Sequence, residues 1–101
     1  MTKEDPVPKF LIEVAHNANP IECARVVQVF LGTGSHFLSQ AEWGCADGVH
    51  SAYMVVDVES KQEALRIVPP AFHSRTKLIG LNRFSMADIE PILKTHPETK
   101  A

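Results

Sequence analysis

The stretch "EWGCADGVHSAYMVVD", residues 42–57, holds the clearest local structural signal in this chain of 101 residues. Asp47-Gly48 is a dipeptide typical of tight hairpin turns, and it stands between two runs suited to β-strands. The second run, from Ser51 to Glu59, is rich in Val, Tyr and Met. The sequence therefore predicts an antiparallel hairpin with Asp47 and Gly48 as its two central turn residues.

An alternating segment precedes this hairpin. In "KFLIEVAH", residues 9–16, every second residue is apolar on one face, which is the pattern of a half-buried strand. Asn19 is then a good helix N-cap, Pro20 suits the first helical position, and the following "GTG" ends the apolar run. We therefore expect a strand over 9–16 and a helix from Pro20 to about Leu31.

A second helix, a fourth strand and a terminal helix are expected after the hairpin. Ser60 begins the capping box "SKQE", and the helix that it predicts ends at Pro69-Pro70. The apolar run "TKLIGLNRF", residues 76–84, predicts a strand, and Ser85 precedes "MADIEPILK", which predicts a short helix. The order is β-α-β-β-α-β with one further helix.

This order predicts an α+β fold, the ferredoxin-like βαββαβ sandwich, with an antiparallel sheet of strand order 4-1-3-2 and both main helices on one face. We expect a single domain over residues 9–95, preceded by a loose arm at 1–8 and followed by a polar tail at 96–101.

The uncovered face of such a sheet would expose an apolar strip. Leu11, Tyr53 and Val55 all fall on that face, and a strip of this size is unfavourable in water. The sequence therefore predicts a symmetric homodimer in which two sheets pack face to face as a dimeric α+β barrel.

Composition narrows the classes of function. The formal net charge is −2, so no basic field points to nucleic acid. No signal peptide is recognisable, and no apolar run approaches the ~18 residues of a membrane span. We expect a cytoplasmic protein whose cysteines are reduced thiols.

The expected topology sends thiols and imidazoles to one end of the fold. With a two-residue turn, Cys45 lies opposite His50, at about 4.5–5.5 Å between Cβ atoms. His16 ends the neighbouring strand, and Cys23 stands in the first turns of the helix above it. Such ligands suit Zn²⁺, and also Cu, Ni or Fe, so we expect a metal site at these four residues. Each residue taken singly could instead serve only packing.

Two more of the five histidines, His36 and His73, are not assigned to this group. His36 is expected to end the first helix, at the opposite end of the fold. His73 falls in the loop "PPAFHSRT" at the same end as the four ligands, where it could be a fifth neighbour, but we expect it to be exposed to solvent.

The open face offers a different chemistry. Glu13 and Asp57 could form an acid–base pair inside the barrel, with Tyr53 orienting a substrate. They could equally be rim carboxylates that pair with Arg83 or Lys77. No phosphate-binding or nucleophile motif is present.

The segments "PKFLIEVAH" and "IGLNRFSMADIEPIL", with the hairpin between them, resemble the small dimeric α+β-barrel proteins of the ferredoxin-like superfamily. These include muconolactone isomerase-like, antibiotic-monooxygenase-like and stress-responsive barrel groups. The opening "KFLIE" is also similar to small nickel-binding proteins of that fold. The resemblance covers about residues 8–95 and implies a homodimer with a pocket between sheet and helices, but no catalytic residues of these groups match here.

Three functions follow from these observations. The first is a homodimeric binding protein that holds a transition metal or small ligand at the hairpin end. The second is a cofactor-independent enzyme, isomerase-like or monooxygenase-like, acting on a small metabolite. The third is an interaction module whose edge strand pairs with another protein.

Overall fold

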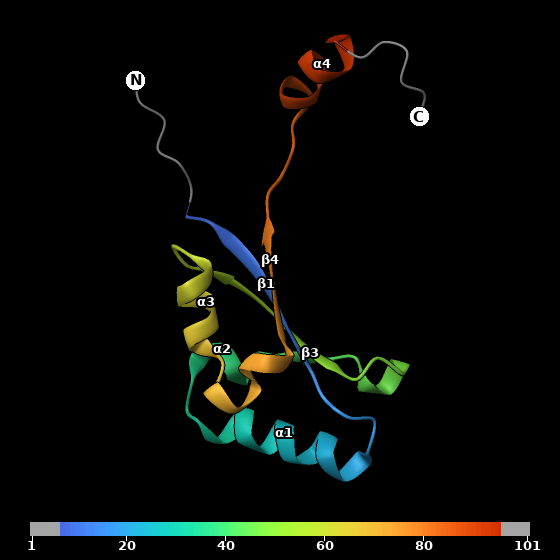
Figure 1. Ribbon diagram of the computed structural model, residues 1–101, viewed down its shortest axis with the longest axis vertical. Helices are drawn as coiled ribbons and strands as arrows, with labels where there is room; N and C mark the ends of the chain where they lie inside the picture. The colour runs from blue at the N-terminus through green and yellow to red at the C-terminus, as the bar shows by residue number, and fades with distance from the viewer. Residues whose placement is uncertain (1–6, 96–101) are drawn as a thin grey trace.

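An antiparallel sheet of four strands organises the chain in a computed structural model that describes residues 7–95 (Figure 1). The expected polar tail and most of the expected arm lie outside the described residues. The elements in chain order are β1 (Lys9–Ala15), α1 (Pro20–Gly32), α2 (His36–Ser39), β2 (Glu42–Trp43), the 3-10 turn η1 (Cys45–Asp47), β3 (Ser51–Asp57), α3 (Lys61–Ile67), the 3-10 turn η2 (Pro70–Arg75), β4 (Thr76–Leu81) and α4 (Met86–Thr95).

The strand order is β2-β3-β1-β4, and every neighbouring pair is antiparallel. Read from the opposite edge, the order is β4-β1-β3-β2, so β1 and β3 are central. The expected α+β class and the antiparallel four-stranded sheet are confirmed, and this architecture is compatible with a ferredoxin-like fold.

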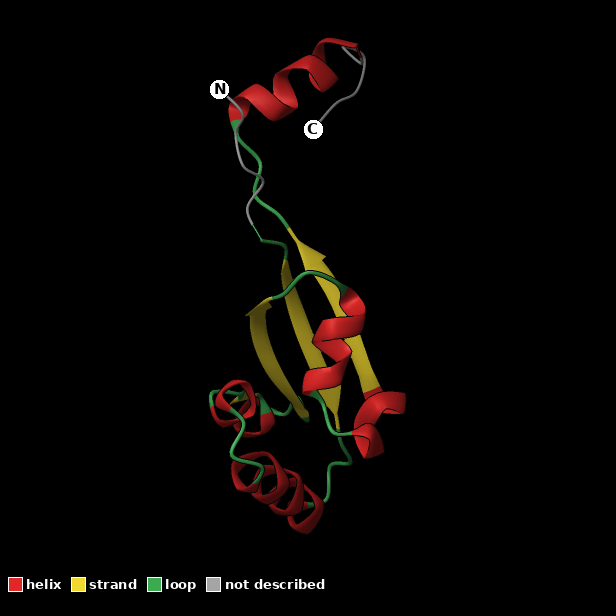
Figure 2. Cartoon of the chain, turned by 90° about the vertical axis from the view of Figure 1, so that its left-hand side faces the viewer, coloured by secondary structure: helices red, strands yellow, loops and turns green. Residues whose placement is uncertain are grey.

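One face of the sheet carries the hydrophobic core. Alternate residues of β1 and β3 point to this face, where α3 lies over the strands and α1 packs at the end of the sheet with Val26 and Phe30 in the core (Figure 2). The buried apolar residues are Phe10, Ile12, Val14, Val26, Phe30, Leu38, Ala52, Met54, Val56, Ala64 and Val68. Because successive side chains of a strand point to opposite faces, the alternating apolar residues of these segments are all buried on one face of the sheet.

The predicted caps begin both main helices. The Asn19 side chain accepts hydrogen bonds from the backbone N–H groups of Ile21 and Glu22, at 2.8 and 3.3 Å. At α3, the Ser60 hydroxyl accepts from the N–H of Glu63 at 3.1 Å. These local bonds satisfy donors that a helix leaves unpaired at its start, so both helix starts follow from the sequence.

The hairpin differs from the expected two-residue turn. Glu42 and Trp43 pair with β3, the Gly44 N–H still donates to the Ser51 carbonyl at 3.1 Å, and the chain then forms η1. The Gly44 carbonyl accepts from both Asp47 and Val49, at 2.9 and 3.0 Å. A Cβ at Gly44 would stand 2.7 Å from the Val49 carbonyl oxygen, so glycine permits this longer turn. Strand pairing stops early because the Gly44 carbonyl bonds within the turn, to the N–H groups of Asp47 and Val49.

Two further segments differ from the expectations. His36 does not end α1 but begins the short helix α2, where Ser35 caps the N–H of Leu38 at 3.2 Å and Leu38 reaches the core. Strand β4 ends at Leu81 instead of residue 84, and the Phe84 side chain is 71% exposed.

Helix α4 stands apart from the rest of the molecule. Figures 1 and 2 show an extended connection that carries it away from the sheet. The Cα radius of gyration is 17.9 Å, whereas a compact chain of this length has about 13 Å. The molecule is therefore elongated by this C-terminal element.

Among residues 7–95, no helix combines the length and the apolar character needed to cross a membrane.

Candidate metal centre

Three elements bring His16, Cys23 and Cys45 together. His16 directly follows β1, and its backbone N–H donates to the His50 carbonyl at 3.0 Å, which ties the end of β1 to the start of β3. Cys23 lies in the first turns of α1, and its N–H donates to the carbonyl of the cap residue Asn19 at 2.9 Å. Cys45 begins η1. Helix capping and the hairpin turn thus position the two thiols.

The donor atoms of these three residues are close. The Cys23 and Cys45 Sγ atoms are 3.0 Å apart, and Cys45 Sγ is 3.2 Å from His16 Nε2. All three ligand atoms lie within 4.8 Å of one another. In a tetrahedral zinc site, with Zn–S of about 2.3 Å and Zn–N of about 2.0–2.1 Å, neighbouring ligand atoms are about 3.3–3.8 Å apart. The two measured distances are slightly shorter than this range, so both contacts would have to open by a few tenths of an ångström to admit an ion.

The fourth expected ligand, His50, lies beside this group but outside it. Its ring centroid is 5.8 Å from that of His16, with the ring planes 88° apart. Within the part of the chain that the structure describes, the Cys45 thiol bonds to Cys23 and His16, and it makes no hydrogen bond with His50 across the hairpin. The reason is the turn: η1 lifts Cys45 off the ladder, toward α1.

Both histidines carry a buried nitrogen without a hydrogen-bond partner. The Nδ1 atoms of His16 and His50 are each inaccessible to water and unpaired among the described residues. An unsatisfied buried polar group costs about 1–3 kcal/mol, so native structures retain few of them. Each of the two histidines thus retains one buried nitrogen with unused hydrogen-bonding capacity at this end of the fold.

The local electrostatics keep the His16 imidazole neutral. Burial lowers the pKa of His16 below its usual value, and the nearby charges of His50 and Arg75 lower it further, against a smaller opposing effect of Glu22. The neutral imidazole is the form that binds metals. Arg75 comes from the loop before β4, which the expected topology also places at this end. Its position follows from the register, in which Thr76 lies opposite Val14, two residues before His16.

Cys45 is a thiol when no metal binds it. Hydrogen bonding with the Cys23 thiol raises the pKa of Cys45, and burial adds to this effect. A metal ion would therefore have to displace the thiol proton to gain the thiolate ligand.

Aromatic side chains form the wall behind His16. The Trp43 and His16 ring centroids are 5.8 Å apart in an edge-on arrangement, and Trp43 lies 5.1 Å from Phe30 in the core. His16 itself is only 7% exposed. This wall holds the imidazole orientation and limits the approach of water, which strengthens any charge interaction at the site.

The open-face residues Glu13, Tyr53 and Asp57 do not all meet. Glu13 Oε2 accepts hydrogen bonds from Ser51 at 3.1 Å and from Tyr53 at 3.5 Å. Asp57, in contrast, is exposed and lies opposite Lys9, four residues further along β3 than Tyr53. The register therefore separates the two carboxylates that were expected to form an acid–base pair.

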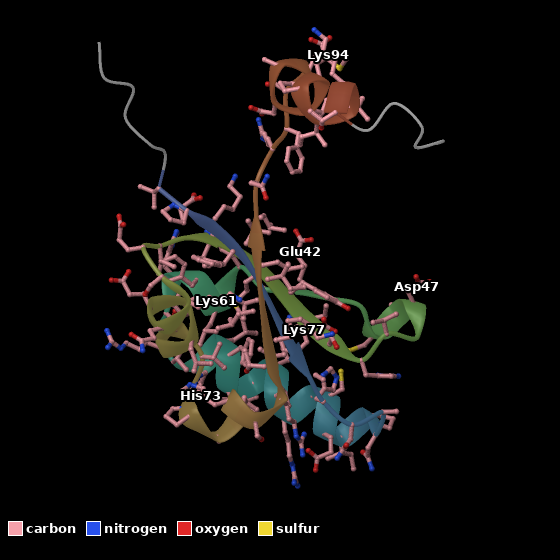
Figure 3. All side chains as sticks on the ribbon, turned by 45° about the horizontal axis from the view of Figure 1, so that its top comes forward. Glu42, Asp47, Lys61, His73, Lys77 and Lys94 are labelled. Carbon is pink, nitrogen blue, oxygen red and sulfur yellow. The ribbon has the colours of Figure 1, made fainter. Side chains whose placement is uncertain are left out.

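Two other histidines, His36 and His73, lie outside the metal group. His73 is half-buried, and its Nε2 lies 2.6 Å from the Val68 carbonyl at the end of α3, so the expectation of a free loop residue was wrong. His36 is exposed on α2, 3.4 Å from the Gln40 amide. Figure 3 shows Asp47 at the outer end of the hairpin turn and His73 on η2.

No family model, no curated protein and no solved structure matches this chain. The similarity to dimeric barrel proteins accordingly rests on the sequence pattern alone. What characterises the chain is the group of one imidazole and two thiols at the junction of β1, α1 and the hairpin, a group that could hold a metal ion.

Proposed function

We propose that this protein binds a transition metal ion through His16 Nε2, Cys23 Sγ and Cys45 Sγ, with His50 as the fourth ligand. The observation that carries the proposal is the convergence of three ligand atoms within 4.8 Å from three separate elements. Each of the three residues taken alone could serve only packing or hydrogen bonding.

The donor set favours Zn²⁺. Two thiolates and two imidazoles form the tetrahedral set of structural zinc sites, and the same soft ligands also accept copper or nickel. The buried, unpaired Nδ1 of His50 supports its assignment as the fourth ligand, because a metal bond would satisfy an imidazole nitrogen in this position. Four protein ligands close the coordination sphere, so a binding or structural role is favoured over catalysis at the metal.

Such an ion would join segments that are distant in the sequence. The contacts of Cys45 with Cys23 and His16 link the hairpin turn to α1 and to the end of β1. Metal bonding would replace weak thiol hydrogen bonds by strong bonds and would contribute directly to folding stability. Thiolate ligands require a reducing compartment, which supports a location in the cytoplasm.

Elemental analysis tests the proposal. The full chain, purified with a thiol reductant and no chelator, is expected to carry a single equivalent of metal per chain. Cys45→Ser and His16→Ala are expected to lose most of it, because each removes a ligand from a site of few ligands. His36→Ala is the matched control, because His36 is exposed and outside the group, and it should retain the metal.

Wild-type protein with only trace metal, and no change in its melting temperature when Zn²⁺, Ni²⁺ or Cu²⁺ is added, would remove the metal function. His50→Ala tests whether His50 is the fourth ligand. If it is, the visible spectrum of the cobalt-loaded variant should differ from that of the cobalt-loaded wild type.

We also propose that the protein is a homodimer through its open sheet face, within the ferredoxin-like barrel arrangement. Val55, Leu11 and Ile79 lie opposite one another on β3, β1 and β4 and form an apolar row across that face. Val55 is 58% exposed and Ile79 is 38% exposed, so this row has no cover within residues 7–95. A second copy would bury it.

The two alternatives have less support. An acid–base enzyme would rest on Glu13 alone, since Asp57 lies elsewhere on the sheet. Pairing of another protein at β2, the edge that the sequence analysis expected, would have only two strand residues to use.

A further inference from the structure

Helix α4 has an apolar stripe that nothing in residues 7–95 covers. Met86, Ile89 and Leu93 repeat at the helical spacing of three and four residues, with Ile92 beside them. In the connection before the helix, Phe84 is also apolar. The exposed fractions are 71% for Phe84, 62% for Met86, 56% for Ile92 and 55% for Leu93.

A helix of this kind is not stable by itself. It has ten residues and contains Pro91, which lacks the backbone N–H of the helical ladder. Isolated helices shorter than about 12–15 residues are marginal in water even when their residues favour helix formation. Ser85 and Asp88 do cap it reciprocally, at 2.8 and 3.2 Å, but one capping box does not replace tertiary packing. The stripe therefore requires a surface to pack on.

A groove with both apolar and cationic lining residues lies at the end of β4. It has a volume of about 870 Å³ and is lined by Val7, Lys9, Val55, Leu81, Asn82 and Arg83. Val55 also belongs to the apolar row of the open face, so the groove continues the proposed dimer surface. The groove contributes the cations Lys9 and Arg83, whereas α4 carries the acids Asp88 and Glu90 and one cation, Lys94, so the groove and the helix have opposite net charges.

The chain's own helix does not reach this groove. Residues 82–85 connect β4 to α4 in an extended conformation (Figures 1 and 2). Four residues span at most about 14 Å, and in this extended form they direct the helix away from the sheet and the groove. Figure 3 shows Lys94 on α4 far from Lys77 on β4.

We propose that α4 of one copy packs in this groove of a second copy, and that the two copies exchange their helices reciprocally around a two-fold axis. The inference rests on the proposed homodimer and names the segment that completes it. One symmetric contact would cover both unpartnered surfaces of each chain, the stripe and the groove, and would leave neither exposed.

The area involved is sufficient. A fully exposed large apolar side chain presents about 150–200 Å², so two exchanged stripes and grooves would bury on the order of 1,000–1,500 Å², against about 1,200–2,000 Å² in stable interfaces. An acid in the centre of such a stripe should weaken the dimer by about tenfold or more in Kd.

Sedimentation of the full chain over a concentration series tests the exchange. Leu93→Asp puts a carboxylate on the stripe and should shift the protein to monomer, and Val55→Asp should do the same from the sheet side. Ala87→Asp adds the same charge to the same helix away from the stripe, so it should remain dimeric. A dimeric Leu93→Asp with a monomeric Val55→Asp overturns the exchange but keeps the homodimer, and a monomeric wild type overturns both.

Cross-linking of a mixture of ¹⁴N-labelled and ¹⁵N-labelled chains identifies whose groove is occupied. An amine-reactive reagent should join Lys94 to Lys9 in pairs of mixed isotope. Pairs of only one isotope would show that α4 folds back on its own sheet, and dimers without a Lys94–Lys9 link would show that α4 packs elsewhere. Either result overturns the exchange. Metal content should be the same in all of these variants. A result that overturns the helix exchange can therefore be distinguished from a result that overturns metal binding.

Discussion

At the scale of single residues, the candidate site depends on how two neighbouring groups hold their protons. His16 is neutral because its folded pKa lies below its usual value, and Cys45 is protonated because its folded pKa is raised. The imidazole is therefore ready to bind a metal at neutral pH, whereas the thiol must first lose its proton. Metal affinity at this site is limited by the thiol and not by the histidine.

This difference predicts that metal affinity rises with pH through the neutral range. Below the thiol pKa, each displaced thiol proton contributes about a tenfold gain in apparent affinity per pH unit. Competition titrations of Zn²⁺ against a chelator at pH 6.5 and pH 7.5 measure the effect, and proton release in weak buffer provides a second readout. An affinity independent of pH would mean that the thiols are not the ligands.

At low pH, protonation of the His16 imidazole also affects the stability of the fold. A lowered folded pKa means that the unfolded chain takes up a proton first, so this histidine's contribution to stability is present above the usual pKa of 6.5 and is lost as pH falls below it. The metal-free protein should therefore be less stable in acid partly because of this one group.

At the scale of elements, Gly44 connects the hairpin to the metal site. A Cβ there would lie 2.7 Å from the Val49 carbonyl oxygen and 3.1 Å from the Val49 Cβ, so the turn that presents Cys45 has no room for a side chain. The turn geometry is consequently a condition of the site and not only of the strand pairing.

Gly44→Ala is therefore expected to lower the free energy of unfolding by about 1–3 kcal/mol and to weaken metal binding, since Cys45 is displaced. Gly32→Ala is the matched control, because a Cβ at Gly32 at the end of α1 meets nothing within 4 Å. That substitution should be neutral or stabilising by up to about 1 kcal/mol. Urea unfolding and metal titration of both variants measure the difference, and equal behaviour of the two would contradict the role of Gly44.

The same element shows why the sequence predicted some features and missed others. The starts of α1 and α3 were predictable because their caps are contacts within three residues along the chain. The turn was not, because Asp47-Gly48 gives a strong local signal that the contact of Gly44 with Val49 overrides. Three of the expected ligands still converge, since the strand register and the helix start place them at one end even though the turn differs.

At the scale of the whole molecule, the metal group and the apolar surfaces lie at opposite ends. His16 follows the end of β1 that faces the hairpin, whereas the groove lies at the beginning of β1, beside Lys9. The isolated position of α4 could not be inferred from sequence, because its amphipathic pattern shows that it needs a partner surface but not which one.

This separation predicts that metal removal and dimerisation are independent. Treatment with a chelator should lower the melting temperature, because the links among β1, α1 and the hairpin are weakened, and it should leave the sedimentation coefficient of the dimer unchanged. Calorimetry and sedimentation on the same samples measure both. Dissociation upon chelation would instead place the metal at the interface between copies.

The edge-on contact of Trp43 with His16 has a practical consequence. The chain has one tryptophan, and it lies against an imidazole that an arriving ion would engage. Its ultraviolet emission is therefore a built-in optical reporter, sensitive to events at that ring and free of interference from any other indole. Occupancy can be followed in native, unlabelled protein in real time, one fluorophore for one site.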